Sequence, residues 1–419
     1  MMNMQYIKGF EDKKYGLLGE HLSHSFSPQI HSAMADYPYT LCEVERENLK
    51  EWVSTNDLCG YNVTIPYKQE IMQYLDNITD AAKAIGAVNT VWRNPDGTLT
   101  GDNTDYYGFE YMLSCLNVSL HGKKALVLGS GGASKTVQAV LAHHGAQVIV
   151  FDLEGATPYS QLPLHLDACA IVNATPVGMY PNTGKSLVDL SQFANCEAVL
   201  DVVYNPAMTA MLLQAKKLSI PCINGLSMLV AQAKRACELF TSHSLDDTVI
   251  ESIRRSIAQQ TGNVVLVGMP GCGKSTVGKL VAQMLCRDFV DADDEIKVAT
   301  GKLPSEIITN EGEEAFRKAE TQVLSDICKE SSKVIATGGG AVTIPCNKDI
   351  LMQNGAVIFI ERDTKLLAKD DRPLSKNLDE LYKKRYPLYK DFSVISVDGN
   401  ADAQTVAQRV VDAFFEVVK

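Results

Sequence analysis

The chain has 419 residues, of which 46% are hydrophobic and 21% charged, and its formal net charge at pH 7 is −11. This length leaves room for two or three core-forming units, and the acidic balance argues against general binding to nucleic acid or to anionic membranes. The eleven cysteines include no CxxC pair, which is typical of reduced thiols in a cytoplasmic protein. Residues 1–19 lack the apolar core of a secretory signal, and no apolar run is long enough to predict a membrane span.

Three polar motifs in the first part of the chain have plain structural explanations when each is taken alone. The segment Ser25-Phe26-Ser27-Pro28 is typical of a helix N-terminus, with a hydroxyl cap and a proline in the first turn. Lys68 follows Ile-Pro-Tyr, where a solvated surface lysine is expected, and Asn103-Thr104-Asp105 has the composition of a turn. Only their combination with other motifs favours a functional interpretation.

The middle of the chain predicts a strand, a glycine turn, a helix and a second strand. The strands are expected at residues 124–128 and 147–151, with the helix at 136–144 between them. Further short strands are expected at 170–172 and 198–202. This order is that of a parallel sheet with crossover helices.

A helix is expected to close this part of the chain. Within the polar segment 241–262, the large apolar residues recur at near-helical spacing: Leu245, Val249, Ile250, Ile253 and Ile257. A short linker is expected at residues 259–262, before a second strand–loop–helix unit begins at residue 263.

That second unit contains a phosphate-binding loop. An apolar strand at 263–267 leads into GMPGCGKS at 268–275, and a helix follows at 276–285. The glycines allow backbone N–H groups to surround a β-phosphate, Lys274 reaches the β- and γ-oxygens, and Ser275 can ligate Mg²⁺. The sequence therefore predicts that ATP or a close relative is bound by Gly268, Gly271, Cys272, Gly273, Lys274, Ser275 and Thr276.

Several polar features follow the phosphate loop, and each alone has a structural explanation. Asp291 could cap a helix, Arg317 could form a surface ion pair, and Gly338–Gly340 could be a turn. Together, and in this order behind a phosphate loop, these features resemble shikimate kinase over residues 263–419. The complete set consists of Asp291, Asp293, Phe316-Arg317, Gly338-Gly339-Gly340, Arg372-Pro373-Leu374 and Arg385-Tyr386-Pro387-Leu388-Tyr389.

The kinase resemblance implies roles for these residues. Asp293 would orient the substrate 3-hydroxyl and act as its base, and Arg317 and Arg385 would clamp the substrate carboxylate. The backbone amides of Gly338–Gly340 would approach the substrate closely. Asp291, with Ser275, would help to hold Mg²⁺.

The expected lid over the nucleotide departs from the family. Arg372 would close over the transferring phosphoryl group, but the segment before it is short and lacks the family's first arginine. Lys369 is the nearest basic residue, and Asp370 and Asp371 make the lid tip acidic. We therefore expect a weaker grip on the nucleotide or slower turnover.

The first 258 residues resemble shikimate dehydrogenase. The motifs occur in the family's order: SFSP at 25–28, NVTIPYK at 62–68, GAVNT at 86–90, GDNTD at 101–105, GSGGA at 129–133, NATPVGM at 173–179, DVVYNP at 201–206 and GLSMLVAQ at 225–232. The resemblance implies that Lys68 exchanges the proton at the reacting oxygen while Asp105 holds the lysine. It also implies a substrate site that is completed by Ser25, Ser27, Thr64, Asn89, Tyr204 and Gln232.

The nicotinamide site shows a second departure. The resemblance places the cofactor on Gly129, Gly131, Gly132, Ala133, Asn173 and Thr175. The family's arginine for a 2′-phosphate is missing, since no arginine lies between Arg93 and Arg235. Asp152 instead lies 23 residues after Gly129, as in sites that bind a free ribose hydroxyl. We expect NAD(H) to be preferred over NADP(H), or cofactor binding to be weak. Lys135 is the cation expected to bind the 2′-phosphate if NADP(H) is preferred instead.

Together the two resemblances imply an α/β chain in four parts: a substrate lobe at 1–110, a Rossmann-like dinucleotide lobe at 111–225, closing helices at 226–258, and a P-loop kinase domain with a parallel sheet at 263–419. The implied function is reduction of 3-dehydroshikimate to shikimate with NAD(P)H, followed by ATP- and Mg²⁺-dependent phosphorylation of shikimate. Three alternatives stay open: a catabolic quinate/shikimate dehydrogenase, a kinase for another small alcohol such as gluconate, and a binding module that has lost catalysis in one half. The oligomeric state is left open.

Overall fold

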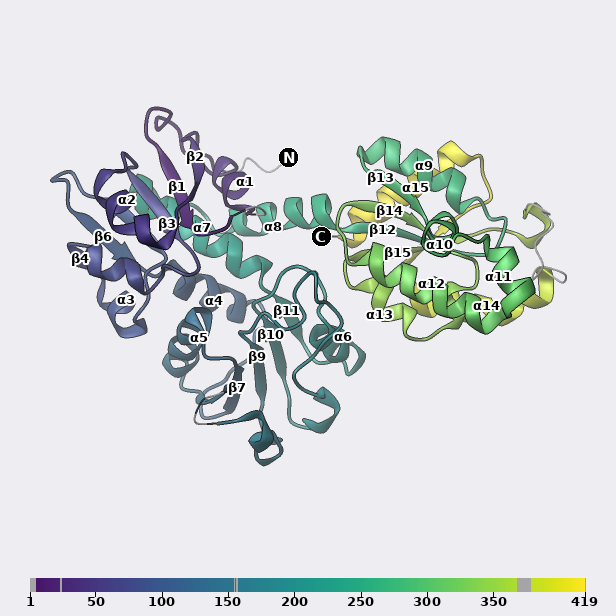
Figure 1. Cartoon of the computed structure of the whole chain (residues 1–419), viewed down its shortest axis with the longest axis horizontal. Coiled ribbons are helices and arrows are strands. Elements are labelled where there is room, and N and C mark those ends of the chain that lie inside the picture. The colour runs from purple at the N-terminus through teal and green to yellow at the C-terminus, as the bar shows by residue number, and fades with distance from the viewer. Residues whose placement is uncertain (1–4, 23–24, 154, 156, 368–377, 419) are drawn as a thin grey trace. The chain divides into compact units, whose positions relative to one another are not determined.

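The computed structural model describes residues 5–22, 25–153, 155, 157–367 and 378–418. Its α/β chain divides into two compact units (Figure 1). The first unit comprises Met1–Val177, Ser186–Tyr204 and Gln214–Arg254, and the second comprises Gly178–Lys185, Asn205–Leu213 and Arg255–Lys419. Two short segments that were expected in the dinucleotide lobe, 178–185 and 205–213, thus belong to the second unit.

The first sheet of the first unit is mixed, with strand order β2-β1-β3-β5-β6-β4. Its strands are β1 (Tyr15–Gly19), β2 (Tyr39–Glu43), β3 (Gly60–Val63), β4 (Asn77–Ile78), β5 (Thr90–Arg93) and β6 (Leu99–Asp102). Its helices are α1 (Ser27–Ser32), α2 (Leu49–Thr55) and α3 (Asp80–Ile85), with 3-10 turns at Arg46–Asn48 and Glu70–Tyr74. Buried Leu18, Tyr61 and Val91 belong to the core of this lobe.

The second sheet is parallel throughout, with order β11-β10-β9-β7-β8. Its strands are β7 (Lys124–Leu128), β8 (Gln147–Phe151), β9 (Ala170–Asn173), β10 (Ala198–Asp201) and β11 (Cys222–Asn224), and its helices are α5 (Gly132–His143) and α6 (Ala210–Lys217). The expected strands at 124–128 and 147–151 are confirmed. The helix begins four residues earlier than expected, because the extended Gly131 ends the turn and Gly132 already belongs to the first helical turn.

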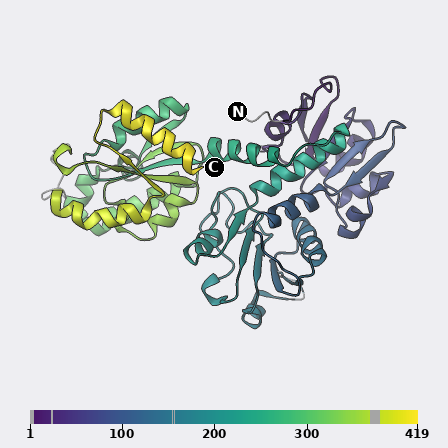
Figure 2. The ribbon, with the colours of Figure 1, turned by 180° about the vertical axis from the view of Figure 1, so that it is seen from behind.

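Two long helices pack together beside these sheets (Figure 2). They are α4 (Thr104–Ser114) and α7 (Leu226–Thr241). Gly108 allows their close approach, because a Cβ at this position would lie 2.7 Å from the carbonyl oxygen of Met228. Since α4 begins at Thr104, Asp105 lies in its first turn, where it contacts Lys68 of the substrate lobe.

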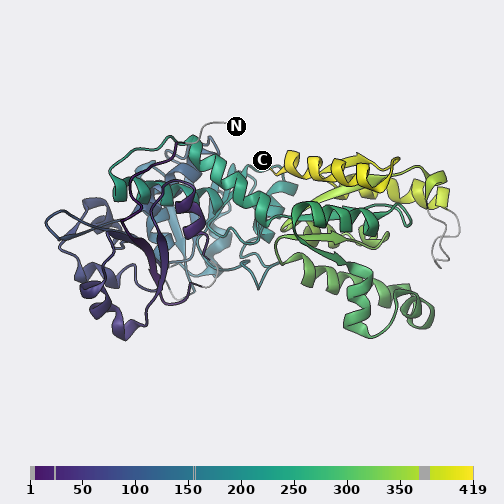
Figure 3. The same cartoon turned by 90° about the horizontal axis from the view of Figure 1, so that it is seen from above.

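The third sheet forms the centre of the second unit and is parallel, with order β13-β14-β12-β15-β16. Its strands are β12 (Asn263–Val267), β13 (Asp288–Asp291), β14 (Lys333–Ala336), β15 (Gly355–Glu361) and β16 (Ile395–Asp398). Helices lie on both sides of the strand layer (Figure 3). They are α9 (Lys274–Leu285), α10 (Ala292–Thr300), α11 (Pro304–Glu311), α12 (Glu313–Cys328), α13 (Asn347–Met352), α14 (Leu378–Phe392) and α15 (Ala403–Val417).

The expected linker at 259–262 is wrong. Helix α8 (Thr248–Thr261) continues through this segment, and β12 begins at Asn263. The residues before Gly262 are compatible with a helix and include no proline, and Thr261 Oγ1 donates to the carbonyl of Ile257. Across the residues that the structure describes, no helix has the length and apolar character needed to cross a membrane.

Candidate functional site

A cavity of about 500 Å³ in the first unit collects the expected substrate residues of the dehydrogenase part. It is lined by residues from β3 and the loop after it, from α4 and from α7. All eight expected substrate residues line it, together with Ala133 of the cofactor loop: Ser25, Ser27, Thr64, Lys68, Asn89, Asp105, Tyr204 and Gln232. Residues separated by more than 200 positions in the sequence thus share one cavity.

Lys68 and Asp105 form an ion pair at this cavity. Lys68 Nζ lies 2.6 Å from Asp105 Oδ2, and their side chains are 20% and 11% exposed. The Lys68 carbonyl accepts a 2.7 Å hydrogen bond from Val88 N, which fixes the backbone beneath the side chain. Asp105 lies in the first turn of α4, where the helix dipole favours a carboxylate. Lys68 is therefore not a solvated surface lysine. Its ammonium group is fixed by Asp105 and has further N–H donors for a substrate oxygen.

The Asn89 side chain is oriented by bonds to α4. Its Oδ1 accepts from Thr104 N at 2.7 Å and from Thr104 Oγ1 at 3.1 Å. Because the carbonyl end is used in this way, the amide NH₂ is the end left for a ligand in the cavity. Gln232 donates to the Leu229 carbonyl at 2.9 Å, so its orientation is also fixed.

Sequence reasoning missed Asn62 and His21, which line the same cavity. Asn62 is 5% exposed, accepts from Tyr39 OH at 2.7 Å and donates to Thr90 Oγ1 at 3.0 Å. The period of two along a strand was the available signal, because it places Asn62 on the same face as Thr64.

The glycine loop after β7 is shaped for close approach of a ligand. Gly129 has φ +103°, and a Cβ there would lie 2.6 Å from Thr175 Cγ2. A Cβ on Gly131 or Gly132 would meet no atom within 4 Å, so the space in front of both is open. The Ser130 hydroxyl donates to Asp152 Oδ2, which holds this carboxylate beside the loop.

The other expected cofactor residues are used inside the protein. Asn173 is 3% exposed, and its amide donates to Asp201 Oδ1 at 2.9 Å. Its oxygen accepts from Thr175 N and Thr175 Oγ1 at 3.1 and 2.7 Å. Side-chain contacts from this pair to a cofactor therefore lack support in the geometry, and their main chain remains available. Among the described residues between β8 and β9 there is a 3-10 helix at Tyr159–His165.

The phosphate loop of the second unit joins β12 to α9. Lys274 is 7% exposed, and its Nζ donates to the carbonyls of Gly268 and Met269 at 2.9 and 3.1 Å. Ser275 Oγ donates to Asp291 Oδ2 at 2.6 Å. Asp291 also caps α10, since its Oδ1 accepts from Asp293 N at 3.1 Å. The helix-cap explanation and the proximity to Ser275 therefore both hold for Asp291.

The expected acceptor residues of the kinase part come together beside this loop. The guanidinium of Arg317 occupies the place that a Cβ on Gly340 would take, and Arg385 Nη1 donates to the Gly339 carbonyl at 3.2 Å. Asp293 Oδ1 lies 3.4 Å from the Cβ position of Gly338. Arg317 is 8% exposed and pairs with the fully buried Glu320, so it is not the surface ion pair considered from sequence. Arg385 is 7% exposed. Arg372, with Lys369, Asp370 and Asp371, lies outside the described residues.

Glu320 is a further residue of this group that sequence reasoning missed. It is fully buried, and its Oε2 accepts from Arg317 Nη1 at 2.7 Å. Its Oε1 has no hydrogen-bond partner among the described residues and points at Gly338. Burial raises the pKa of the Glu320 carboxyl, and the charge of Arg317 opposes this rise. The spacing of three from Arg317 on one helix face was the available signal.

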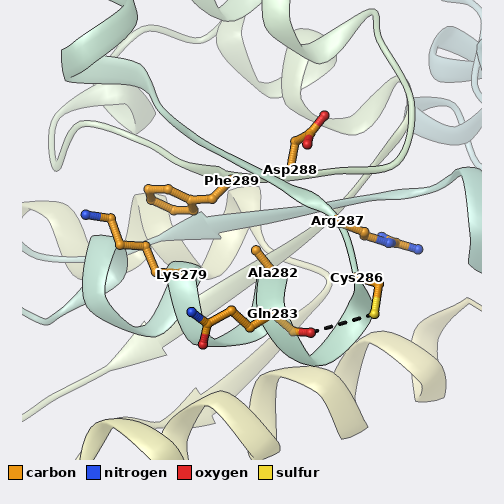
Figure 4. A pocket seen from close by; sticks show the side chains of 7 residues that line it. All are labelled: Lys279, Ala282, Gln283, Cys286, Arg287, Asp288 and Phe289. Carbon is orange, nitrogen blue, oxygen red and sulfur yellow. Dashed lines mark hydrogen bonds between the residues drawn. The ribbon is translucent and has the colours of Figure 1, made fainter.

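A second hollow in this unit lies away from the phosphate loop (Figure 4). It is formed by the C-terminal half of α9 and the start of β13, whereas the phosphate loop meets the N-terminal end of α9. Lys279 and Arg287 point to opposite sides of it. Arg287 Nη1 is bound at 2.6 Å to the Gly262 carbonyl, so this arginine is used within the fold.

Comparison with known proteins agrees with both halves. Residues 17–91 match the family model for the shikimate dehydrogenase substrate binding domain, and residues 270–415 match that for shikimate kinase. The chain is 37% identical over 260 residues to shikimate dehydrogenase (NADP(+)) of Clostridium beijerinckii, covering 57% of this chain and 96% of that protein.

Solved structures of shikimate dehydrogenases are also similar to the dehydrogenase part of the chain. A chorismate mutase/shikimate 5-dehydrogenase fusion protein from Clostridium acetobutylicum is 37% identical, with a TM-score of 0.56, over 58% of this chain and 97% of that one. Shikimate 5-dehydrogenase from Listeria monocytogenes, solved with shikimate and NAD, is 29% identical, with a TM-score of 0.52, over 59% and 97%. The chain therefore belongs to the shikimate dehydrogenase family and carries a shikimate kinase domain behind it, so that it is a bifunctional enzyme of the shikimate pathway.

Proposed function

We propose that the first part of the chain reduces 3-dehydroshikimate to shikimate and that the second part phosphorylates shikimate on its 3-hydroxyl. The observation that carries the first step is the Lys68–Asp105 pair at 2.6 Å in a cavity lined by hydroxyl and amide groups. A polyhydroxylated ring acid needs such a lining, because each buried hydroxyl requires a hydrogen-bond partner.

In the first step, Lys68 donates a proton to the carbonyl oxygen as that oxygen gains negative charge. When bound, a nicotinamide cofactor would supply the hydride for the carbonyl carbon. Asp105 orients the ammonium group of Lys68, and Asn89 and Gln232 hold ring hydroxyls through amide groups that the fold already orients. Ser25 and Ser27 line the cavity beside the N-terminus of α1 and would bind the carboxylate.

In the second step, Asp293 accepts the proton of the attacking hydroxyl, while Arg317 and Arg385 bind the substrate carboxylate. Lys274 and the loop amides hold the ATP phosphates, and Mg²⁺ would bind at Ser275 and Asp291, whose oxygens lie 2.6 Å apart. Chelation with EDTA should then abolish shikimate phosphorylation and leave shikimate oxidation unchanged.

The first part also carries a proposed preference for NAD(H). Asp152 lies beside the glycine loop and is bonded to Ser130, where its charge would repel a 2′-phosphate and accept a hydrogen bond from a 2′-hydroxyl. The related clostridial enzyme is named for NADP(+), and the related Listeria structure contains NAD. The family thus accommodates both cofactors, and Asp152 is the residue of this chain that favours one of them.

This preference is tested by kcat/KM for shikimate oxidation with NAD⁺ and NADP⁺, in the native chain and in Asp152→Ser. We expect NAD⁺ to be favoured by about tenfold or more, equivalent to about 1.4 kcal/mol, and the substitution to narrow the ratio by improving NADP⁺. Quinate is tested as a second substrate in the same assay, because its oxidation would favour the alternative of a catabolic quinate/shikimate dehydrogenase. A native preference for NADP⁺ would show that a cation such as Lys135 dominates the pocket.

A further inference from the structure

Arg362 lies at the edge of the phosphate loop and has no role in the sites described above. It follows β15, the strand that pairs with β12 on the side away from β14. The phosphate loop rests on this strand end, since a Cβ on Gly268 would lie 2.8 Å from the Ile360 carbonyl oxygen. Arg362 therefore leaves the sheet directly beside the loop that holds phosphate.

The backbone on both sides of Arg362 is anchored. The Glu361 carbonyl accepts from Gly399 N at 2.7 Å, and Asp363 N donates to Asn400 Oδ1 at 2.9 Å. The turn after β16 thus holds both neighbours of Arg362. The position of this arginine is set by the fold rather than by a free loop.

The Arg362 side chain is directed at the phosphate loop, since its Nη1 lies 3.7 Å from the Cβ position of Gly273. Its buried Nε has no hydrogen-bond partner within the part of the chain that the structure describes. Across the described residues it forms no ion pair, and the adjacent carboxylate of Glu361 is paired with Lys390 at 3.2 Å. A buried guanidinium donor without an acceptor is destabilising, and a bound anion would supply the missing acceptor.

Two other arginines of the same unit have partners within the protein. Arg287 donates to the carbonyls of Gly262, Gln259 and Gln260. Arg317 is paired with Glu313 and Glu320, although its Nε has no hydrogen-bond partner among the described residues. Arg362 differs from both in facing a loop whose backbone is built to hold phosphate. An anionic ligand bound at the phosphate loop would be close enough to pair with Arg362.

The strand order decides which part of the nucleotide Arg362 meets. Asp293, Arg317 and Gly338–Gly340 follow β13 and β14, on one side of β12, and Arg385 of α14 reaches them through its bond to the Gly339 carbonyl. Arg362 follows β15 on the other side. The γ-phosphate must face the acceptor, so the opposite side receives the α-phosphate. We propose that Arg362 binds the α-phosphate of ATP and ADP, which supplies a nucleotide contact that the shortened lid lacks. This proposal rests on the adenine nucleotide being the ligand of the phosphate loop.

The test is calorimetric binding of ADP and of adenosine to the full chain without acceptor, for the native protein, Arg362→Ala and Arg362→Lys. Lys365→Ala is the matched control, because Lys365 is an exposed cation of the same segment. We expect Arg362→Ala to raise the Kd for ADP by about 10- to 100-fold, Arg362→Lys to restore part of the affinity, and Lys365→Ala to have no effect. The melting temperature of Arg362→Ala should not fall, since an unpaired group is removed.

The outcomes separate this proposal from the kinase assignment. Unchanged ADP affinity in Arg362→Ala would overturn the proposal, and an equal loss for adenosine would overturn the α-phosphate contact in favour of a nucleoside contact. If the native chain failed to phosphorylate shikimate while ADP affinity still depended on Arg362, the acceptor assignment alone would fail. Shikimate oxidation, measured in the same preparations, should be unchanged in all variants.

Discussion

Among single residues, His31 shows how a buried group supports the dehydrogenase cavity from behind. Its ring is fully buried, stacks on Tyr39 at 4.0 Å between ring centroids, and shares a 2.7 Å hydrogen bond with Tyr37 OH. Tyr39 in turn donates to Asn62, which lines the cavity. Burial lowers the pKa of His31 to about 3, so the neutral imidazole is the form that fits this packing.

This shift predicts acid sensitivity of the substrate lobe. Because the folded pKa lies below the unfolded value of about 6.5, the unfolded state binds more protons between these values, and stability falls as pH is lowered through that window. His31 should remove about 2 kcal/mol from the free energy of unfolding between pH 7 and pH 5. Urea unfolding followed by tryptophan fluorescence measures this lobe, because both tryptophans, Trp52 and Trp92, belong to it.

Two variants isolate the contribution of the buried ring. His31→Gln should be less stable at pH 7 but should lose less stability on acidification than the native chain. His144→Gln, at an exposed position, should keep the native dependence on pH. An unaltered pH slope in His31→Gln would mean that other groups cause the acid sensitivity.

At the scale of elements, the glycine turn after β14 is required by a neighbouring side chain rather than by its own backbone. Gly340 has φ −107° and ψ 0°, a conformation open to alanine. The guanidinium of Arg317 nevertheless fills the space that a Cβ would need. Arg317 of helix α12 therefore fits against the turn only because residue 340 has no side chain.

Gly340→Ala should displace Arg317 and weaken binding of the acceptor carboxylate. We expect the KM for shikimate in the kinase reaction to rise by about tenfold or more, with a loss of about 1–3 kcal/mol in stability. The comparison variant is Gly131→Ala, where a Cβ meets no protein atom, so its melting temperature should match that of the native chain. A native KM in Gly340→Ala would show that Arg317 does not bind the acceptor.

At the scale of the whole molecule, each candidate site is built from residues of one compact unit. The cavity with Lys68 and Asp105 belongs to the first unit, and the phosphate loop with Lys274 belongs to the second. Among the described residues, neither site includes a side chain from the other unit.

Lys68→Ala should therefore abolish shikimate oxidation and spare phosphorylation, while Lys274→Ala should do the reverse. Each loss should be about 100-fold or more, since a proton donor or a phosphate ligand is removed. Both activities are measured on each preparation, with Lys83→Ala, an exposed lysine of the substrate lobe, as control. Loss of both activities in either variant would reveal coupling between the sites.

The chemistry of the two halves could be predicted from the amino-acid sequence alone, because motifs such as GMPGCGKS and NVTIPYK combine residue type with spacing along one segment. The sequence also predicted the parallel strands at 124–128 and 147–151, because two short apolar runs are separated by a glycine turn and a helix. Local patterns of this kind depend on neighbouring residues alone, so they can be read without the fold.

Which side chains remain available for ligands depends on the three-dimensional packing. In the structure the Asn173 amide is bonded to Asp201, and α8 extends to Thr261, within the segment expected to be a linker. Arg362 Nε lies at the phosphate loop without a partner among the described residues. The packing also places Glu320 and Asn62 at the sites. These outcomes depend on partners distant in sequence, and the hydrogen-bond balance of a buried group is set by packing that no local pattern encodes.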